Sequence, residues 1–203
     1  MLHLDGSSFS GSGTIVRFGV SLAALTGQVL HLTNVRARRA PPGLRPQHLK
    51  AVEAVTQLCQ GTLEGGTVGS QEIVFHPGRR PQGGSFQWNI GTAGSTTMLA
   101  LALLPVAAFA RGPQTLQHIT GGLFQDFAPS AFRLQHALLP LVRRMGLQAE
   151  LRIRRPGYVP TGGGSIEVKV TPVGSMLGSL TMRERGGNLR YWGYTQDLYK
   201  NYR

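Results

Sequence analysis

Apolar side chains recur along the chain with the spacings of both helices and strands. The helical period is clearest over residues 47–59, where one face carries Leu49, Val52, Val55 and Leu58. Strand-like alternation is clearest over residues 165–170, where apolar and charged side chains take turns. Residues 15–25 and 98–109 are apolar nearly throughout, which predicts two buried helices. Helices and strands of this kind predict a mixed α/β protein.

The expected elements occur twice in the same order, about 83 residues apart. Each copy has a Gly/Ser loop, an apolar helix, a strand, a second helix and two strands. In the first copy the elements are expected over residues 15–25, 29–33, 47–59, 62–64 and 71–75. In the second copy they are expected over residues 98–109, 116–120, 130–145, 148–153 and 165–170. Pro140 predicts a kink or break in the last helix.

Two such copies predict tandem units in which helices pack on small sheets. We expect the boundary in the Pro- and Gly-rich residues 76–84. The first unit is therefore predicted over residues 1–80 and the second over residues 81–172. Residues 173–203 are expected to begin a further or inserted segment that is truncated.

The chain is strongly basic, with a formal net charge of +12 over 203 residues. This charge favours a polyanionic partner such as nucleic acid or a nucleotide, although a solubility role is the simpler alternative. The single cysteine, Cys59, falls on the apolar face of a helix and suits a reducing compartment, so we expect a cytoplasmic or nuclear protein. No signal peptide is apparent. Residues 98–109 are too short to cross a bilayer, so no membrane is expected.

Residues 35–48 carry the densest chemical signal. Three prolines stiffen this segment, and Arg36, Arg39 and Arg45 offer forked donors that fit phosphate oxygens. Pro46 suits the first position of a helix, whose N-terminal amides would add to an anion site. A solvated basic loop is the alternative. His48, at this helix start, is the one histidine that we consider a site candidate.

Two glycine-rich segments are weaker candidates. Residues 5–14 lead into the first apolar helix, where Arg17 follows, and could cradle a phosphate, although they are not a Walker A loop. Residues 158–164 could approach a ligand or form a hairpin bend. The histidines lack metal-ligand spacing, and the nine acidic residues are not paired for acid–base chemistry.

Motifs along most of the chain resemble those of the RNA 3'-terminal phosphate cyclases. The matching stretches lie in order at residues 34–49, 63–65, 68–70, 75–78, 83–84, 92–95, 121–122, 128–129, 157–164 and 184–186. The resemblance implies a fold of repeated β-α-β-α-β-β units, shared with the enolpyruvyl transferases. A transferase of that related fold is a further option, against which the segment Arg45-Pro46-Gln47-His48 argues.

The resemblance also implies an activity. Family members use ATP and a divalent metal, here Mg²⁺, to adenylate a histidine and then convert an RNA 3'-phosphate to a 2',3'-cyclic phosphate. The implied partners are RNA with a 3'-phosphate end and a nucleotide. The family's phosphate- and nucleotide-binding residues correspond to Arg17, Arg36, Arg39, Gln47 and His48. None of the six histidines aligns with the family's nucleophile, which lies in a later repeat, so the chain is expected to be a fragment or a shortened member.

Three positions depart from the family pattern. The entry loop Phe9-Ser10-Gly11-Ser12-Gly13-Thr14 has Ser10 where the family has a glutamate. Leu101 stands for a glutamine near the nucleotide, and Phe124 for a polar residue of a Gly-Gly-Thr-Asp/Asn segment. These changes favour the alternative of a non-catalytic RNA-binding or ribosome-assembly factor. The oligomeric state stays open.

Overall fold

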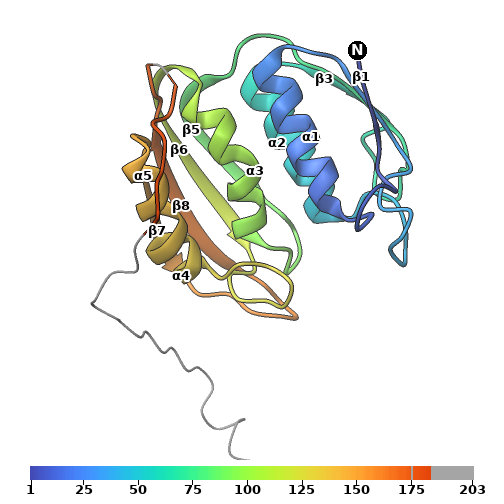
Figure 1. Ribbon diagram of the computed structural model, residues 1–203. Helices are drawn as coiled ribbons and strands as arrows, with labels where there is room; N and C mark the ends of the chain where they lie inside the picture. Colours follow the sequence, from blue (N-terminus) through green and yellow to red (C-terminus); the bar gives the residue numbers. More distant parts are fainter. Residues whose placement is uncertain (175, 184–203) are drawn as a thin grey trace, which may run out of the picture.

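The protein has two four-stranded sheets with three long helices between them (Figure 1). A computed structural model describes residues 1–174 and 176–183. The mixed α/β fold agrees with the class predicted from the sequence and from the family resemblance. Of the predicted segment 173–203, residue 175 and residues 184–203 lie outside the described part.

The first sheet comes from the N-terminal part of the chain. Its strands are β1 (Leu2–Asp5), β2 (Leu30–Thr33), β3 (Thr62–Glu64) and β4 (Ile73–His76). Their order in the sheet is β1-β2-β4-β3. Strand β1 runs parallel to β2, and β4 runs antiparallel to both of its neighbours.

The second sheet repeats this arrangement with longer strands. They are β5 (Gln82–Asn89), β6 (Arg111–Gly121), β7 (Gln148–Arg155) and β8 (Gly164–Thr171). The order is β5-β6-β8-β7, again with one parallel and two antiparallel pairings. The two sheets therefore share strand order and direction. The unit boundaries of the sequence analysis remain a prediction.

The sequence analysis predicted neither β1 nor β5. Strand β1 has only four residues and pairs on one side, so its sequence carries little pattern. Strand β5 contains two glycines and several polar side chains, and it starts inside the predicted linker 76–84. Residues of this kind have low strand propensity, and pairing with β6 along the sheet overrides it.

The three long helices are α1 (Gly13–Thr26), α2 (Pro46–Cys59) and α3 (Thr96–Ala108). Helix α1 starts at the N-cap Ser12 and ends at Gly27, whose left-handed backbone suits glycine. Helix α2 starts with Pro46, as expected. It ends in the left-handed Gln60, one residue before the glycine expected to stop it. Helix α3 is almost entirely buried, in agreement with its apolar sequence.

The fourth predicted helix is divided at its proline. Residues 131–144 form α4 (Ala131–Arg133), a π-helical turn η1 (Leu134–Leu138) and α5 (Leu139–Arg144). The amide of Leu139 donates to the carbonyl of Leu134, five residues back. Pro140 has no amide to continue the helical ladder, so the wider turn precedes it. The predicted kink or break therefore takes the form of a π-helical turn, and the helical backbone continues through it.

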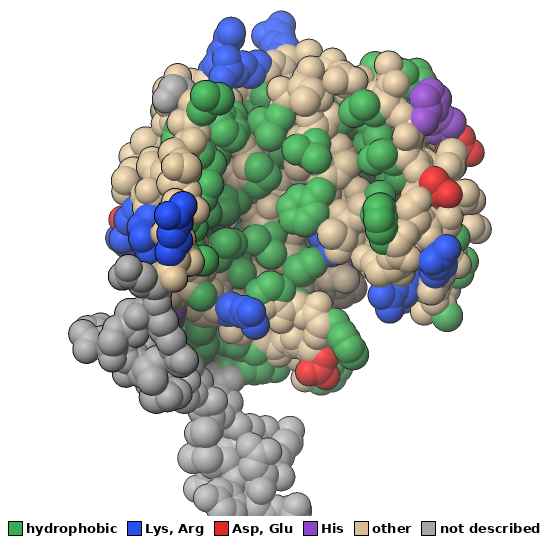
Figure 2. All heavy atoms as spheres, viewed as in Figure 1, with side chains coloured by type: hydrophobic (Ala, Val, Ile, Leu, Met, Phe, Trp, Pro, Cys, Tyr) green, Lys and Arg blue, Asp and Glu red, His purple; other side chains and the backbone are tan. Residues whose placement is uncertain are grey.

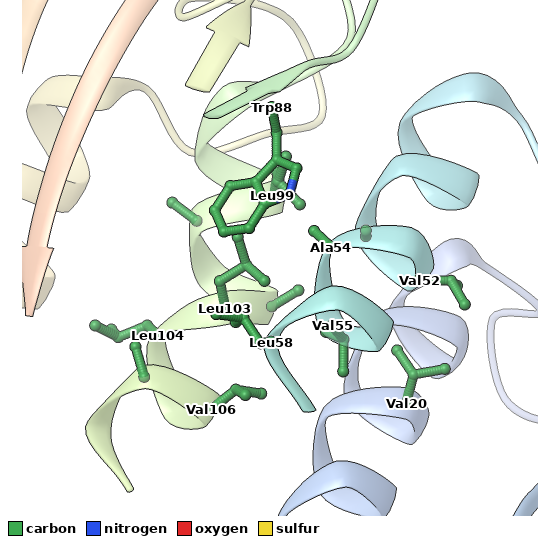
Figure 3. Close-up of a cluster of buried hydrophobic side chains, with 14 of the residues drawn as sticks. Val20, Val52, Ala54, Val55, Leu58, Trp88, Leu99, Leu103, Leu104 and Val106 are labelled. Carbon is green, nitrogen blue, oxygen red and sulfur yellow. The ribbon is translucent and has the colours of Figure 1, made fainter. Parts of the chain in front are cut away.

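The core is continuous between the two sheets. Helices α1 and α2 pack against α3, and Figure 3 shows side chains of all three helices meeting, with Trp88 of β5 beside them. The indole of Trp88 donates to Gln57 Oε1 at 2.8 Å. Ser21 Oγ of α1 donates to the carbonyl of Ala102 in α3 at 2.7 Å. Cys59 is buried in this core, as predicted.

One face of the molecule carries many apolar side chains. Figure 2 shows them gathered over α1 and α3. Phe18 and Leu22, both on α1, are exposed. Across the described ranges, every helix is too short or too polar to span a bilayer.

Candidate anion-binding site

The N-termini of the three long helices lie next to one another. At the start of α1, Gly13 packs directly against the ring of His48 in α2. At the start of α3, the amide of Ser95 donates to Gln47 Oε1 of α2 at 3.0 Å. Helix α2 therefore links the other two. The positive ends of helix dipoles favour anions, so this is a suitable place for phosphate.

His48 is buried and neutral at physiological pH. Its side chain is 4% exposed. Burial lowers the pKa of His48 to about 3, with smaller effects from Arg17, Arg36 and Arg45. The amide of Arg45 donates to His48 Nδ1 at 3.3 Å, so the single ring proton lies on Nε2, next to Gly13. His48 thus fixes the helix starts and adds no charge.

Arg17 is the most buried cation of the site. Its residue is 6% exposed, and one guanidinium nitrogen lies beside Gly13. Burial and, to a smaller extent, the charge of Arg36 lower the pKa of Arg17 to about 10, so the group is still charged at neutral pH. Among the described residues, the guanidinium has no hydrogen-bond or ion-pair partner. A buried, unpaired cation is costly, and a bound anion would relieve the cost.

Arg36 shapes the loop between β2 and α2. Its Nη1 donates to the carbonyls of Pro41 at 3.0 Å and Gly43 at 2.8 Å. Partial burial, Arg45 and Arg39 all lower the pKa of Arg36. Its backbone is left-handed, with φ of 53°. The loop is therefore folded around the guanidinium, which is half-buried beside other cations.

The remaining arginines surround this centre. Arg39 is exposed and close enough to Arg36 to lower its pKa. Arg45, which belongs to the basic segment but not to the family-derived set, acts on both Arg36 and His48. Arg38 donates to the carbonyl of Phe9 at 2.9 Å and so joins the loop to the segment before α1. One carboxylate lies near them: Arg38 helps to lower the pKa of Asp5, which also accepts hydrogen bonds from Ser7 and Asn34. The arginines outnumber this carboxylate, so the site attracts anions.

Gln47 has a structural contact at this place. Its amide oxygen accepts the Ser95 amide, and its Cβ lies beside Gly94. The site residues predicted from the sequence thus fall into two groups. Arg17, Arg36, Arg39 and His48 lie around one centre, whereas Gln47 faces the start of α3. A phosphate contact of Gln47 remains a prediction.

The start of α3 has its polar groups occupied by protein. Ser95 Oγ accepts the amide of Met98 at 3.2 Å, and Thr97 Oγ1 donates to the carbonyl of Pro129 at 2.6 Å. Thr96 Oγ1 donates to the carbonyl of Gly122 at 2.9 Å. Ser12 caps the start of α1 in the same way, so it is the unpaired guanidinium of Arg17 that makes the start of α1 the better anion site.

The glycine-rich segment 158–164 connects β7 and β8. Its backbone forms a bridge between Tyr158 and Gly162, and Gly162 packs against the backbone of Thr92 and Ala93. The hairpin-bend interpretation is the one that its geometry supports. The close approach to Ala93 explains why a side chain at position 162 would not fit.

The site suits a phosphate group better than a metal ion. In residues 1–174 and 176–183, no group of three or more His, Cys, Asp or Glu side chains is placed to hold a metal. Ser10 Oγ donates to Ser12 Oγ at 3.0 Å and supplies no carboxylate. Leu101 packs against the core, and Phe124 stacks with Tyr158 at 5.5 Å between ring centres. Among the described residues, the site therefore offers cations to phosphate oxygens but no ready-made group of protein ligands for Mg²⁺.

The chain was compared with models of known protein families. The model described as RNA 3'-terminal phosphate cyclase matches residues 8–182. This range contains the anion-binding site and both sheets except for β1.

Proposed function

Because the chain belongs to the RNA 3'-terminal phosphate cyclase family, we propose that it binds the 3'-phosphate end of RNA at the anion-binding site. The observation that carries this proposal is Arg17, a buried and charged guanidinium without a protein partner. A terminal phosphate offers several oxygens and up to two negative charges, which suits a guanidinium that still has all its donors.

Each site residue has a role in this proposal. Arg17 contacts the phosphate from its position near the N-terminus of α1. Arg36 and Arg39 neutralise the phosphate and the adjoining backbone, since both lie on the loop beside it. His48 positions Gly13 and Arg17 against α2. Gln47 holds α2 against α3 and offers its amide nitrogen to the ligand.

The family reaction requires more than this site. It takes a nucleotide, a metal ion and a nucleophilic histidine to make the 2',3'-cyclic phosphate. The arginines are suited to hold phosphates of ATP as well as of RNA, but we assign no described residue to the metal or to the adenylated histidine. We place the protein in a reducing compartment, the cytoplasm or the nucleus, because Cys59 is a buried free thiol.

A non-catalytic RNA-binding function is the second candidate. It is favoured by Leu101 and Phe124, which place apolar side chains where the family resemblance implies polar ones near the nucleotide. The two candidate functions predict different outcomes when the protein is given ATP. Incubation with radiolabelled ATP and Mg²⁺ leaves an acid-labile adenylate on a cyclase, whereas a non-catalytic protein stays unlabelled.

The binding proposal is tested by fluorescence anisotropy with a 5'-labelled RNA hexamer. We expect the hexamer with a 3'-phosphate to bind about 10-fold or more tightly than the same hexamer with a 3'-hydroxyl, since charge-assisted hydrogen bonds are lost with the phosphate. Equal affinities for the two hexamers would contradict the proposal.

A further inference from the structure

Phe9 is a large aromatic side chain that lies in solvent. It is 91% exposed and precedes α1 by four residues. Its backbone is left-handed, with φ of 52°, a conformation that a residue with a bulky side chain seldom adopts. Neither hydrophobic burial nor backbone preference explains a phenylalanine here. Strained, exposed residues of this kind are concentrated at functional sites.

The backbone around Phe9 is held on both sides. Arg38 Nη1 donates to the carbonyl of Phe9, and the aliphatic part of Arg38 packs on Gly11. The carboxylate of Asp5 accepts the amide of Ser7 at 2.9 Å and the amide nitrogen of Asn34 at 3.1 Å. The main chain that carries the ring is thus fastened to the loop that carries the arginines.

The surroundings of the ring are polar and basic. Its chain neighbours are serines and a glycine, and Arg38 donates to its backbone carbonyl. In the described part of the chain, no aromatic ring stacks on Phe9. A protein partner needs a contiguous apolar patch with a polar rim, whereas one isolated ring whose backbone is bonded to Arg38 matches an unpaired nucleobase and its phosphate.

From these observations we infer that Phe9 is the stacking platform for an unpaired base of the RNA whose phosphate lies at the anion-binding site. The inference rests on the proposed function and adds a second contact to it. Arg38 holds the backbone of Phe9 through its hydrogen bond to the carbonyl. In this inference it also binds a backbone phosphate next to the stacked base. Stacking on an aromatic side chain tolerates any base, so this contact contributes affinity without sequence specificity.

The chain offers a matched control. Phe127 is also fully exposed, at 105%, and also left-handed, with φ of 62°. Its chain neighbour is Asp126, whereas Arg38 contacts the backbone of Phe9. Phe9→Ala and Phe127→Ala therefore remove equivalent rings from equivalent backbones, in a basic and in an acidic setting.

The test measures binding of the 3'-phosphorylated RNA hexamer to the full chain. We expect Phe9→Ala to weaken binding by about 5- to 150-fold. Phe127→Ala should leave the affinity unchanged. A set of hexamers with one abasic position each should contain one member for which Phe9→Ala costs nothing, since the stacked base is already absent. Phe9→Trp should retain affinity, and its fluorescence should change on binding when compared with that of the wild type.

The outcomes separate this inference from the proposed function. If substitution of Arg17 weakens RNA binding and substitution of Phe9 does not, the stacking inference is wrong and the proposed function stands. Equal losses from Phe9→Ala and Phe127→Ala, or a Phe9→Ala loss that persists with every abasic hexamer, overturn it as well, because the substitution then acts through something other than a stacked base. A wild-type chain that does not bind the hexamer overturns both.

Discussion

The ring of His48 packs directly on the α-carbon of Gly13, with Nε2 as the nearest atom to the position that a Cβ would take. This contact joins the first turn of α1 to the first turn of α2. Arg17 lies one turn further along α1, on the same side of Gly13. The distance between the two helix starts, and with it the place of the guanidinium, therefore depends on a residue without a side chain.

Gly13→Ala should destabilise the protein and disturb the site. The new methyl group would overlap His48, which is buried and has little room to move. We expect a loss of about 1–3 kcal/mol in the free energy of unfolding, measured by urea denaturation, together with weaker RNA binding. Gly19→Ala in the same helix is the control. Its methyl group would meet the exposed side chain of Leu4 and make an ordinary contact with the buried Leu30. Alanine favours the helix by about 1 kcal/mol, so the net effect should be small. Equal losses at positions 13 and 19 would contradict the role of the His48 contact.

The buried His48 should make the stability of the fold depend on pH. Its pKa is about 3 in the folded protein and about 6.5 in the unfolded chain. Between these values the unfolded chain binds more protons, so stability is fully present above pH 6.5 and falls as the pH is lowered. The expected loss from His48 is about 2 kcal/mol between pH 7 and pH 5.

The measurement is urea denaturation of the wild type and of His48→Gln at both pH values. Carboxylates contribute equally to the two proteins, so the difference between them isolates His48. His48→Gln should show a pH dependence that is smaller by about 2 kcal/mol over this range. If His48→Gln showed the same pH dependence of stability as the wild type, the ring of His48 would be accessible to protons in the folded state.

Sequence alone located the basic segment but not the geometry of the site. Arg36, Arg39 and Arg45 could be assigned to an anion site because they share a proline-stiffened loop. The burial of Arg17 was not visible, since it depends on how α1 and α2 approach each other around Gly13. The contact from Gln47 to Ser95 joins residues 48 positions apart. A local sequence pattern does not reveal a contact between residues so far apart in the sequence.

The fold, too, could be predicted from the sequence only in part. Helices α1 and α3 were predictable because their sequences are apolar nearly throughout, and α2 because its apolar side chains follow the helical period. The left-handed Gln60 was missed because Gly61 beside it is the usual residue for that position. Strand β5 was missed because two glycines and a proline-rich approach indicate a loop. Its seven-residue pairing with β6 is a tertiary interaction that no local window contains.

Replacement of Arg17 by methionine should change stability and binding in opposite directions. Methionine keeps the aliphatic volume and removes an unpaired buried charge, so the free energy of unfolding should rise by about 1–3 kcal/mol. Affinity for the 3'-phosphorylated hexamer should fall by about 10- to 100-fold. Urea denaturation and fluorescence anisotropy measure the two effects. A variant that is less stable and binds normally would show that Arg17 supports the fold and not the ligand.

The exposed Arg39 should contribute to RNA binding through the long-range attraction of its charge. Arg39→Ala should leave stability unchanged, because the side chain is in solvent. It should weaken RNA binding and reduce the slope of log affinity against log salt by about 0.7, the value for one phosphate contact on a single strand. Arg111→Ala is the control, since Arg111 is also exposed but lies at the start of β6. Equal effects of the two substitutions would indicate non-specific attraction by the net charge.

Gln47→Glu distinguishes a structural role from a ligand contact. The carboxylate keeps an acceptor for the Ser95 amide and strengthens that hydrogen bond, so the fold should be as stable as the wild type. If the amide nitrogen of Gln47 also contacts the phosphate, the new charge repels it, and binding of the 3'-phosphorylated hexamer should weaken by about 10-fold or more. Gln47→Ala provides the comparison, because it loses the Ser95 contact at a cost of about 1 kcal/mol without adding charge. A Gln47→Glu protein that binds the 3'-phosphate and 3'-hydroxyl hexamers as the wild type does would restrict Gln47 to holding α2 against α3. A selective loss for the 3'-phosphate would extend the anion-binding site across both helix starts, since Gln47 would then reach the ligand from the side of α3.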